Sequence, residues 1–162
     1  MTETRFSVVH VRVTSDRPFA DVQAAFEWRL GRFEPAVYRA PAEGGDPAAI
    51  RARLETMAGS SGFVLFGTSD HGRLLRLVGR PRKAVQYVIG NPLFAVEMTR
   101  HAIGAALYAP LRVLIYEADD GKTRSEYDRP SSLFGQFGDE RVSPMAAALD
   151  QKLEDLAVGA SC

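Results

Sequence analysis

The sequence has little with which to build covalent cross-links, metal sites or membrane spans. Its only cysteine is Cys162, so a disulfide within the chain and a zinc site made from thiolates are both excluded. The charge-free stretch 84–96 is shorter than the roughly 20 residues that cross a bilayer, and Gly90-Asn91-Pro92 interrupts it. Residues 1–13 alternate apolar and charged side chains, which a signal peptide does not. We therefore expect a cytoplasmic protein with no membrane partner.

The chain also lacks a net charge. Lys and Arg total 20, as do Asp and Glu, so no global field attracts the protein to a phosphate backbone. We therefore expect no nucleic-acid partner. One segment is locally basic, with five cations and no acid in eleven residues: Arg73, Arg76, Arg80, Arg82 and Lys83. A solvated surface is the simpler interpretation, and an interaction module that docks an acidic partner protein is the alternative.

Common catalytic signatures are absent as well. The chain has no Gly-x-Ser-x-Gly elbow, no phosphate-binding loop with Lys-Ser/Thr and no dinucleotide fingerprint. Its three histidines, His10, His71 and His101, have no neighbours at metal-ligand spacing. We expect neither a metal nor a cofactor, and whether the protein is an enzyme stays open.

What is present is a core-forming, mixed pattern. With 162 residues and 46% hydrophobic side chains, the chain is expected to form a single domain over residues 1–162. Strands are predicted at residues 6–13, 63–70, 84–89, 111–117 and 123–128, and helices begin near Pro18, Pro47, Pro92 and Ser143. Residues 33–45 are expected to be a long loop, and residues 71–82 fit a strand or helical turns. The interspersed elements predict an α+β fold with a mostly antiparallel sheet and helices packed on one face.

The clearest local signal is a hairpin around Asp119-Asp120-Gly121. A three-residue loop that ends in a left-handed glycine would place Arg112 opposite Asp128 and Tyr116 opposite Arg124. Charged side chains would then share one face, while Val113, Ile115 and Tyr127 share the other. A two-residue loop would instead set Val113 and Ile115 against Asp128 and Glu126, so we predict the three-residue loop.

Several residues have both a chemical and a simpler structural interpretation. Asp70-His71-Gly72 could supply a general base or a hydrogen-bond donor to an anionic ligand, but it could equally be a polar turn. Asn91 is predicted to cap the helix that begins at Pro92, although the same helix start would suit an anion. Two of the carboxylates of Glu117, Glu126 and Asp128 would suit acid–base work, but cross-strand ion pairs with Arg112 and Arg124 are simpler.

Four stretches together resemble the DUF302 family, and they are residues 69–72, 87–93, 107–117 and 126–137. The resemblance is strongest over residues 63–138. It implies a compact α+β sandwich similar to the TATA-box-binding-protein-like arrangement, a homodimer and a biochemical function that is unassigned. Many relatives carry Tyr-Asn-Asp-Pro where this chain has Tyr127-Asp128-Arg129-Pro130, so a role built on that Asn does not transfer.

The resemblance also suggests a site. In the family the Asp-His-Gly turn and the Asp-Arg-Pro-Ser-Ser stretch recur together, so His71 is expected to lie near residues 127–136. The leading hypothesis is a small-molecule-binding or accessory protein. The alternative is an enzyme for a small anionic substrate, with His71 as acid or base and Arg112 as anion clamp. The remaining candidate site residues are Asp70, Asn91, Tyr127, Asp128, Arg129, Ser131 and Ser132.

Overall fold

The computed structural model describes residues 1–162 and contains one six-stranded sheet. The strand order is β1-β6-β5-β4-β3-β2, and every neighbouring pair is antiparallel except β2 and β3. The strands are β1 (His10–Ser15), β2 (Gly31–Arg32), β3 (Val64–Asp70), β4 (Ala84–Gly90), β5 (Leu111–Glu117) and β6 (Thr123–Asp128). The first and last strands are therefore neighbours at one side of the sheet.

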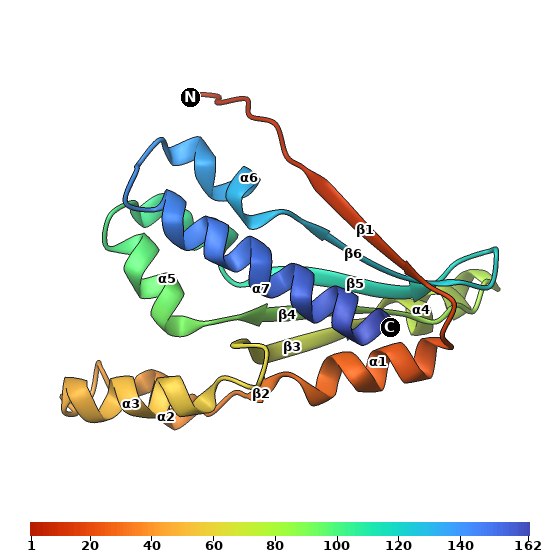
Figure 1. Cartoon of the computed structure of the whole chain (residues 1–162), viewed down its shortest axis with the longest axis horizontal. Coiled ribbons are helices and arrows are strands. Elements are labelled where there is room, and N and C mark those ends of the chain that lie inside the picture. The colour runs from red at the N-terminus through yellow and green to blue at the C-terminus, as the bar shows by residue number, and fades with distance from the viewer.

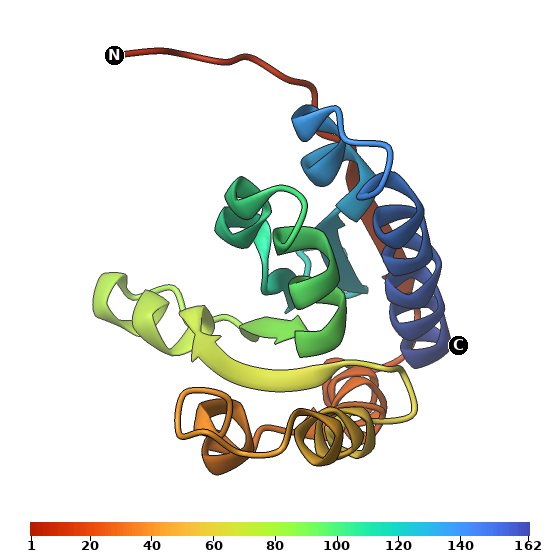
Figure 2. The same ribbon diagram turned by 90° about the vertical axis from the view of Figure 1, so that its left-hand side faces the viewer.

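Helices α1 and α7 lie across one face of this sheet, and α5 lies near its end (Figures 1 and 2). The expected α+β fold with a mostly antiparallel sheet is thereby confirmed. No helix is both long and apolar enough to cross a membrane. The α-helices are α1 (Phe19–Trp28), α2 (Pro35–Arg39), α3 (Pro47–Met57), α4 (His71–Leu74), α5 (Pro92–Thr99), α6 (Pro130–Phe134) and α7 (Ser143–Ser161). The 3-10 helices are η1 (Leu75–Val78), η2 (Ile103–Tyr108) and η3 (Gly135–Phe137).

The main core lies between the sheet and these helices. Side chains alternate along a strand, so each central strand directs every second residue into the core. The core-facing strand residues include Tyr87, Ile89, Val113, Ile115 and Tyr127, all of them buried. They pack against buried side chains of α1 and α7, which are Val22, Phe26, Leu149, Leu153 and Leu156. Helices α1 and α7 both lie on this face of the sheet. The side chains that alternate with the core residues, such as Arg112, Glu126 and Asp128, point to the opposite face.

The β5–β6 hairpin forms in the predicted register. Leu114 pairs with Glu126 and Tyr116 with Arg124. The turn closes through Gly121, whose φ of 79° lies in the left-handed region that glycine tolerates. Its N–H donates to the Ala118 carbonyl at 3.0 Å. The three-residue loop is thus confirmed.

Strand β1 differs from its predicted bounds, because it runs from His10 to Ser15 rather than over residues 6–13. The partner strand sets this range, since β1 pairs with β6 from His10 opposite Asp128 to Ser15 opposite Thr123. Beyond Asp128 the chain turns into α6. The preceding residue, Val9, is held there by the Ser132 hydroxyl, which accepts from its N–H at 3.0 Å. Local sequence could not reveal where the partner ends.

Two other segments resolve into short elements. Residues 33–45 were expected to be a loop, but they include α2, which opens on a proline at its first turn. The ambiguous segment 71–82 forms helical turns, α4 and η1, and η1 ends at the left-handed Gly79. These turns leave Leu74, Leu77 and Val78 largely exposed.

The predicted cap of α5 is also confirmed. The Asn91 side-chain oxygen accepts from the backbone N–H groups of Leu93 and Phe94, at 2.9 and 3.4 Å. Its amide nitrogen donates to the Gly62 carbonyl at 2.9 Å. Asn91 therefore both starts the helix and ties it to the chain segment that enters β3.

We predict that Asn91→Ala lowers the free energy of unfolding by about 1–2 kcal/mol, because it removes the cap and a hydrogen bond to Gly62. Urea denaturation measures the change. Asn91→Asp keeps an acceptor for the helix but loses the donor to Gly62, so it should fall between the wild type and the alanine variant. An alanine variant as stable as the wild type would contradict this assignment.

Candidate functional site

The sheet face opposite α1 and α7, which we call the open face, gathers the charged side chains of three strands. Strand β1 contributes His10 and Arg12, which lie opposite Asp128 and Glu126 of β6. Strand β5 adds Arg112, Leu114 and Tyr116 in the same alternation. Because β1 and β6 are distant in sequence, only the folded sheet brings these groups together.

Glu126 is the centre of a hydrogen-bonded cluster on this face. Its carboxylate accepts from the Tyr116 hydroxyl at 2.7 Å and from the Arg12 guanidinium. The imidazole of His10 bridges two acids, with Nε2 3.2 Å from Glu126 and Nδ1 3.0 Å from Asp128. A protonated His10 would donate to both carboxylates.

The two central groups shift each other's protonation. Partial burial opposes the ionisation of Glu126, but hydrogen bonds from Tyr116, Arg12 and His10 outweigh it and hold the pKa of Glu126 below its usual value. Hydrogen bonds to Asp128 and then Glu126 raise the pKa of His10. The Glu126 side chain is only 13% exposed, whereas that of His10 is 54% exposed. The cluster therefore favours ionised Glu126 and protonated His10.

A pocket of about 410 Å³ adjoins this cluster. Two charged residues line it, Arg112 and Asp128, and the rest of its wall is mainly apolar: Val88, Leu107, Tyr108, Ala109, Pro110, Leu111 and Leu133. We call it the Arg112 pocket. It combines one cation, one anion and an apolar wall, which is the usual make-up of a small-molecule site.

Arg112 has no ion-pair partner, which corrects the expected cross-strand pair. Asp128 contacts His10 instead, and Arg124 binds Asp120 of the hairpin loop at 2.6 Å. The backbone pairing between β5 and β6 ends at Val113 and Tyr127, so it stops one residue short of Arg112. The Arg112 guanidinium is therefore free to meet a ligand at the pocket.

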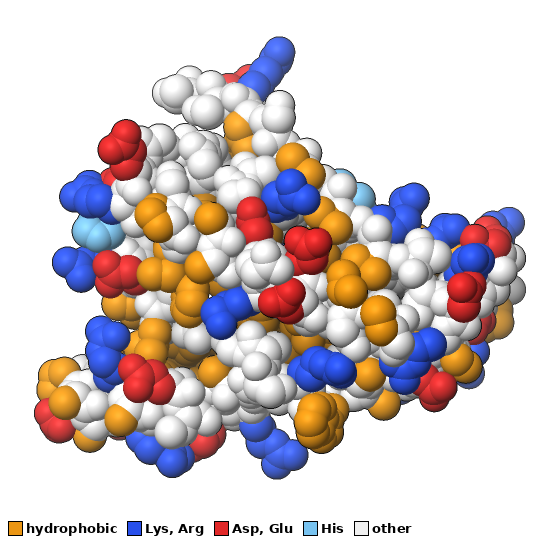
Figure 3. Space-filling model, in the orientation of Figure 1, with side chains coloured by type: hydrophobic (Ala, Val, Ile, Leu, Met, Phe, Trp, Pro, Cys, Tyr) orange, Lys and Arg blue, Asp and Glu red, His pale blue; other side chains and the backbone are white.

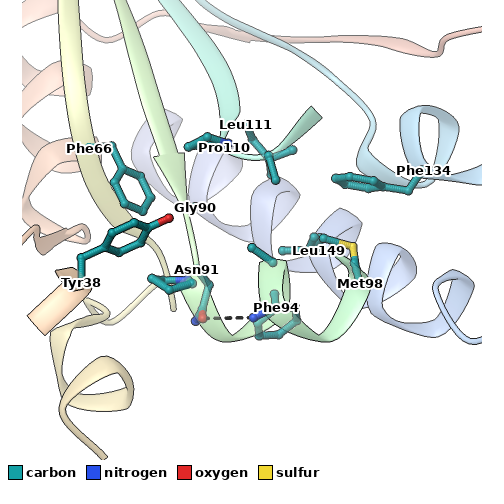
Figure 4. A pocket seen from close by; sticks show the side chains of 13 residues that line it. Tyr38, Phe66, Gly90, Asn91, Phe94, Met98, Pro110, Leu111, Phe134 and Leu149 are labelled. Atoms are coloured by element: carbon teal, nitrogen blue, oxygen red, sulfur yellow. Dashed lines mark hydrogen bonds between the residues drawn. The ribbon is translucent and has the colours of Figure 1, made fainter. Parts of the chain in front are cut away.

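A second, apolar cavity of about 50 Å³ lies at the end of the sheet beside α5 (Figure 4), and we call it the inner chamber. The rings of Tyr38 and Phe66 flank one side of it, and Met98, Phe134 and Leu149 flank the other. It shares the wall segment from Ala109 to Leu111 with the Arg112 pocket. Asn91 lines it too, but both ends of that amide are already hydrogen-bonded within the protein.

His71 does not reach residues 127–136, so that expectation is wrong. Strand β3 ends at Asp70, which pairs with Val85, and the same row continues through Ile115 to Ser125. His71 therefore lies three strands from β6 and at the opposite end from Asp128. Asp70 caps the following helix by accepting from the Arg73 N–H at 2.7 Å, which supports the polar-turn interpretation.

The remaining candidates have structural partners. Tyr127 is buried and faces the core, so it does not line the Arg112 pocket. Burial, and then the nearby charge of Glu154, raises the pKa of its hydroxyl. Arg129 donates its backbone N–H to the Val9 carbonyl. The backbone N–H of Ser131 donates to Asp150 of α7 at 2.8 Å, and the Ser132 hydroxyl donates to the Arg129 carbonyl at 2.7 Å.

Sequence reasoning missed His10, Arg12 and Tyr116. Their signal was the alternation of His10 and Arg12 along β1, but its meaning depends on β6 as the partner strand. No group of three or more His, Cys, Asp or Glu side chains in the chain is arranged to hold a metal ion. The two ring nitrogens of His10 instead face two separate carboxylates.

A family model described as "Domain of unknown function DUF302" matches residues 40–158. The chain belongs to the DUF302 family. The match extends beyond the stretch 63–138 and takes in all of α3. No curated protein matches the chain.

A solved DUF302 structure shares this fold. It is described as "Crystal structure of uncharacterized conserved protein DUF302 from Bacillus stearothermophilus", with a TM-score of 0.65 and 14% sequence identity. The similarity covers 93% of this chain and 97% of that one. At this identity the likeness concerns the fold alone, and the biochemical role of the family is unassigned.

We predict that His10 titrates above the ordinary histidine pKa and that Asp128→Asn moves it back toward that value, since the Asp128 hydrogen bond is the largest cause of the rise. An NMR titration measures both. The stabilisation from protonated His10 should be full below about pH 6.5 and lost as the pH rises through the raised pKa. His71 is the internal control, because its resonances, three strands away, should not respond to Asp128→Asn. A His10 that is indifferent to the substitution would contradict the cluster.

Proposed function

We propose that this DUF302 protein binds a small organic anion in the Arg112 pocket, with Arg112 as the anion clamp. The observation that carries the proposal is a guanidinium without an ion-pair partner beside a cavity of about 410 Å³. A planar guanidinium offers paired N–H donors that match a carboxylate or phosphate. The apolar wall supports a ligand whose body is organic rather than a bare inorganic ion.

The neighbouring charges favour this ligand class. Asp128 also lines the pocket and would repel an anion, but His10 contacts its carboxylate at 3.0 Å. The raised pKa of His10 keeps that imidazole protonated over a wider pH range, which offsets the Asp128 charge. Arg112 then supplies the uncompensated positive charge at the pocket.

The enzyme alternative required His71 and Arg112 to act on one substrate. Arg112 retains its proposed role, but His71 follows β3 at the other end of the sheet, away from the pocket. The geometry therefore supports binding better than acid–base catalysis by His71. The single-domain extent and the cytoplasmic location stay predictions, and the latter rests on the cysteine content.

We predict that Arg112→Ala weakens binding of a small carboxylate by about tenfold or more, because a charge-assisted hydrogen bond contributes about 1.5–3 kcal/mol. NMR chemical-shift titration with benzoate and hexanoate measures the affinity. Arg124→Ala is the matched control, since Arg124 lies on the same face but is paired with Asp120. Equal losses in the two variants, or no binding by the wild type, would contradict the proposal.

We also propose a homodimer, which the family resemblance implies, with the segment from α4 to η1 at its interface. Leu74, Leu77 and Val78 are 62%, 86% and 71% exposed there, an apolar cluster that a second copy would remove from water. Arg76 and Arg80 beside it have no ion-pair partner, whereas Arg82 and Lys83 pair with Asp119 and Glu117. An acidic partner protein is the alternative occupant.

We predict that Leu77→Asp converts a dimer to a monomer, because it places a charge where apolar side chains would meet. Native mass spectrometry measures the mass of each species. Trp28→Asp, which alters an exposed apolar residue of α1 instead, should stay dimeric. A monomeric wild type would rule out the homodimer, and a dimer unaffected by Leu77→Asp would place the interface elsewhere.

A further inference from the structure

We infer that His10 regulates the Arg112 pocket through Asp128. When His10 is protonated, it holds the Asp128 carboxylate and leaves Arg112 free for the anion. When His10 is neutral, Asp128 pairs with Arg112 instead and competes with the ligand. The inference rests on the proposed function, in which Arg112 is the anion clamp, and it adds the regulation of that site. The protein then binds its ligand under slightly acidic conditions and releases it as the pH rises.

Asp128 has a cationic neighbour on each side of its strand. On one side it pairs with His10 of β1, and the Asp128 Oδ1 lies 3.0 Å from the His10 Nδ1. On the other side the hairpin register places Arg112 of β5 next to it, one residue beyond the last pair, Val113 and Tyr127. Neighbouring strands are only about 4.8 Å apart, and both Arg112 and Asp128 line the pocket. One carboxylate can therefore pair with either cation, and in this structure it pairs with His10.

The protonation state of His10 decides how strongly it competes for Asp128. A protonated imidazole has two N–H donors, and the two ring nitrogens lie 3.0 Å from Asp128 and 3.2 Å from Glu126. A neutral imidazole keeps only one N–H and no charge, so the two carboxylates compete for that donor. A charge-assisted hydrogen bond is also roughly twice as strong as a neutral one. Loss of the proton therefore frees Asp128 to accept from the Arg112 guanidinium.

Glu126 does not take part in this exchange. Its carboxylate accepts from the Tyr116 hydroxyl at 2.7 Å and from the Arg12 guanidinium, and neither donor depends on the state of His10. The Glu126 side chain is also less exposed than that of Asp128, at 13% against 39%. Asp128 has no donor comparable to these two among its ion pairs, so it is the carboxylate that changes partner.

Few charged groups act on His10. Hydrogen bonds to Asp128 and then Glu126 raise its pKa, burial opposes them, and the charges of the two acids add a smaller rise. The charged side chains of the elements packed around His10 are Glu126 and Asp128 of β6, Arg12 of β1, and Asp150 and Glu154 of α7, which lies on the other sheet face. The Asp150 carboxylate is held there by the Ser131 N–H. The pair formed with Asp128 and Glu126 therefore sets the titration of His10.

No net field of the molecule overrides this local exchange. Lys and Arg total 20, as do Asp and Glu, and Figure 3 shows acidic and basic side chains interspersed over one side of the molecule. With His10 protonated, the group of His10, Asp128 and Arg112 has one more positive than negative charge, whereas with His10 neutral the charges balance. Since solvent screens these partly exposed groups, we expect a coupling near the low end of the usual range, about fivefold in affinity.

The test is the affinity of the full chain for benzoate, measured by NMR titration or calorimetry between about pH 5.5 and 8.5. A simple carboxylate stays ionised over this range because free carboxyl groups titrate at about pH 4, so a change in affinity comes from the protein. The affinity should be highest below about pH 6.5 and fall about fivefold as the pH rises through the raised pKa of His10. Without ligand, the side-chain N–H resonance of Arg112 should move over the same range as Asp128 approaches it.

Three variants separate the roles of His10 and Asp128. His10→Gln removes the group that titrates, so it should bind benzoate at every pH as weakly as the wild type does at high pH. His10→Lys keeps a cation over the whole range, and Asp128→Asn removes the competing carboxylate, so both should bind tightly without pH dependence. His71→Gln is the matched control, because His71 lies three strands from β6 and should leave the pH profile unchanged. Thermal unfolding shows whether each variant is folded.

The outcomes separate this inference from the proposed function. If benzoate binds through Arg112 with an affinity that does not depend on pH, the regulation by His10 is wrong and the anion site stands. If the pH dependence persists in His10→Gln or in Asp128→Asn, another group causes it and the inference is again overturned. If benzoate binds at no pH and Arg112→Ala changes nothing, the proposed function itself fails, and the inference fails with it.

Discussion

The register of the β5–β6 hairpin is the constraint on which the rest of this structure depends. The left-handed Gly121 closes a three-residue loop, and this pairing sends Val113, Ile115 and Tyr127 toward α1 and α7. Because side chains alternate with a period of two, a slip by one residue would turn Glu126 and Asp128 into the core. Strand β1 pairs with β6, so the face to which β6 directs Glu126 and Asp128 is also the face on which His10 and Arg12 meet them. The charged cluster on the open face therefore depends on the same turn.

Features encoded within a few residues were predictable from the sequence, because their physics is local. Asn91 precedes a proline and caps α5 as expected, and the three-residue hairpin loop was identified by comparing which side chains share a face in the two possible registers. The bounds of β1 and the position of His71 were not predictable in this way. Each depends on which strands are neighbours, and β1 and β6 are separated by more than one hundred residues.

The candidate site was half predictable for the same reason. Arg112 and Asp128 belong to one hairpin, and both line the pocket as their shared face suggested. His10 joins them only because the first strand pairs with the last, and it changes which side chain is the partner of Asp128. It takes the Asp128 carboxylate that the hairpin alone would have offered to Arg112. A contact across a hundred residues therefore decides which charge at this face stays unpaired.

The sheet face covered by α1 and α7 stabilises the fold, whereas the open face carries the proposed binding site. Apolar side chains of the core face pack against α1 and α7, where the loss of even one methyl group costs free energy. Arg112 lies on the other face, is exposed and supports no ion pair, so its replacement removes little that holds the fold together. A residue whose replacement costs the fold so little can serve ligand binding without loss of stability, and Arg112 meets this condition because its exposed side chain lies outside the packed core.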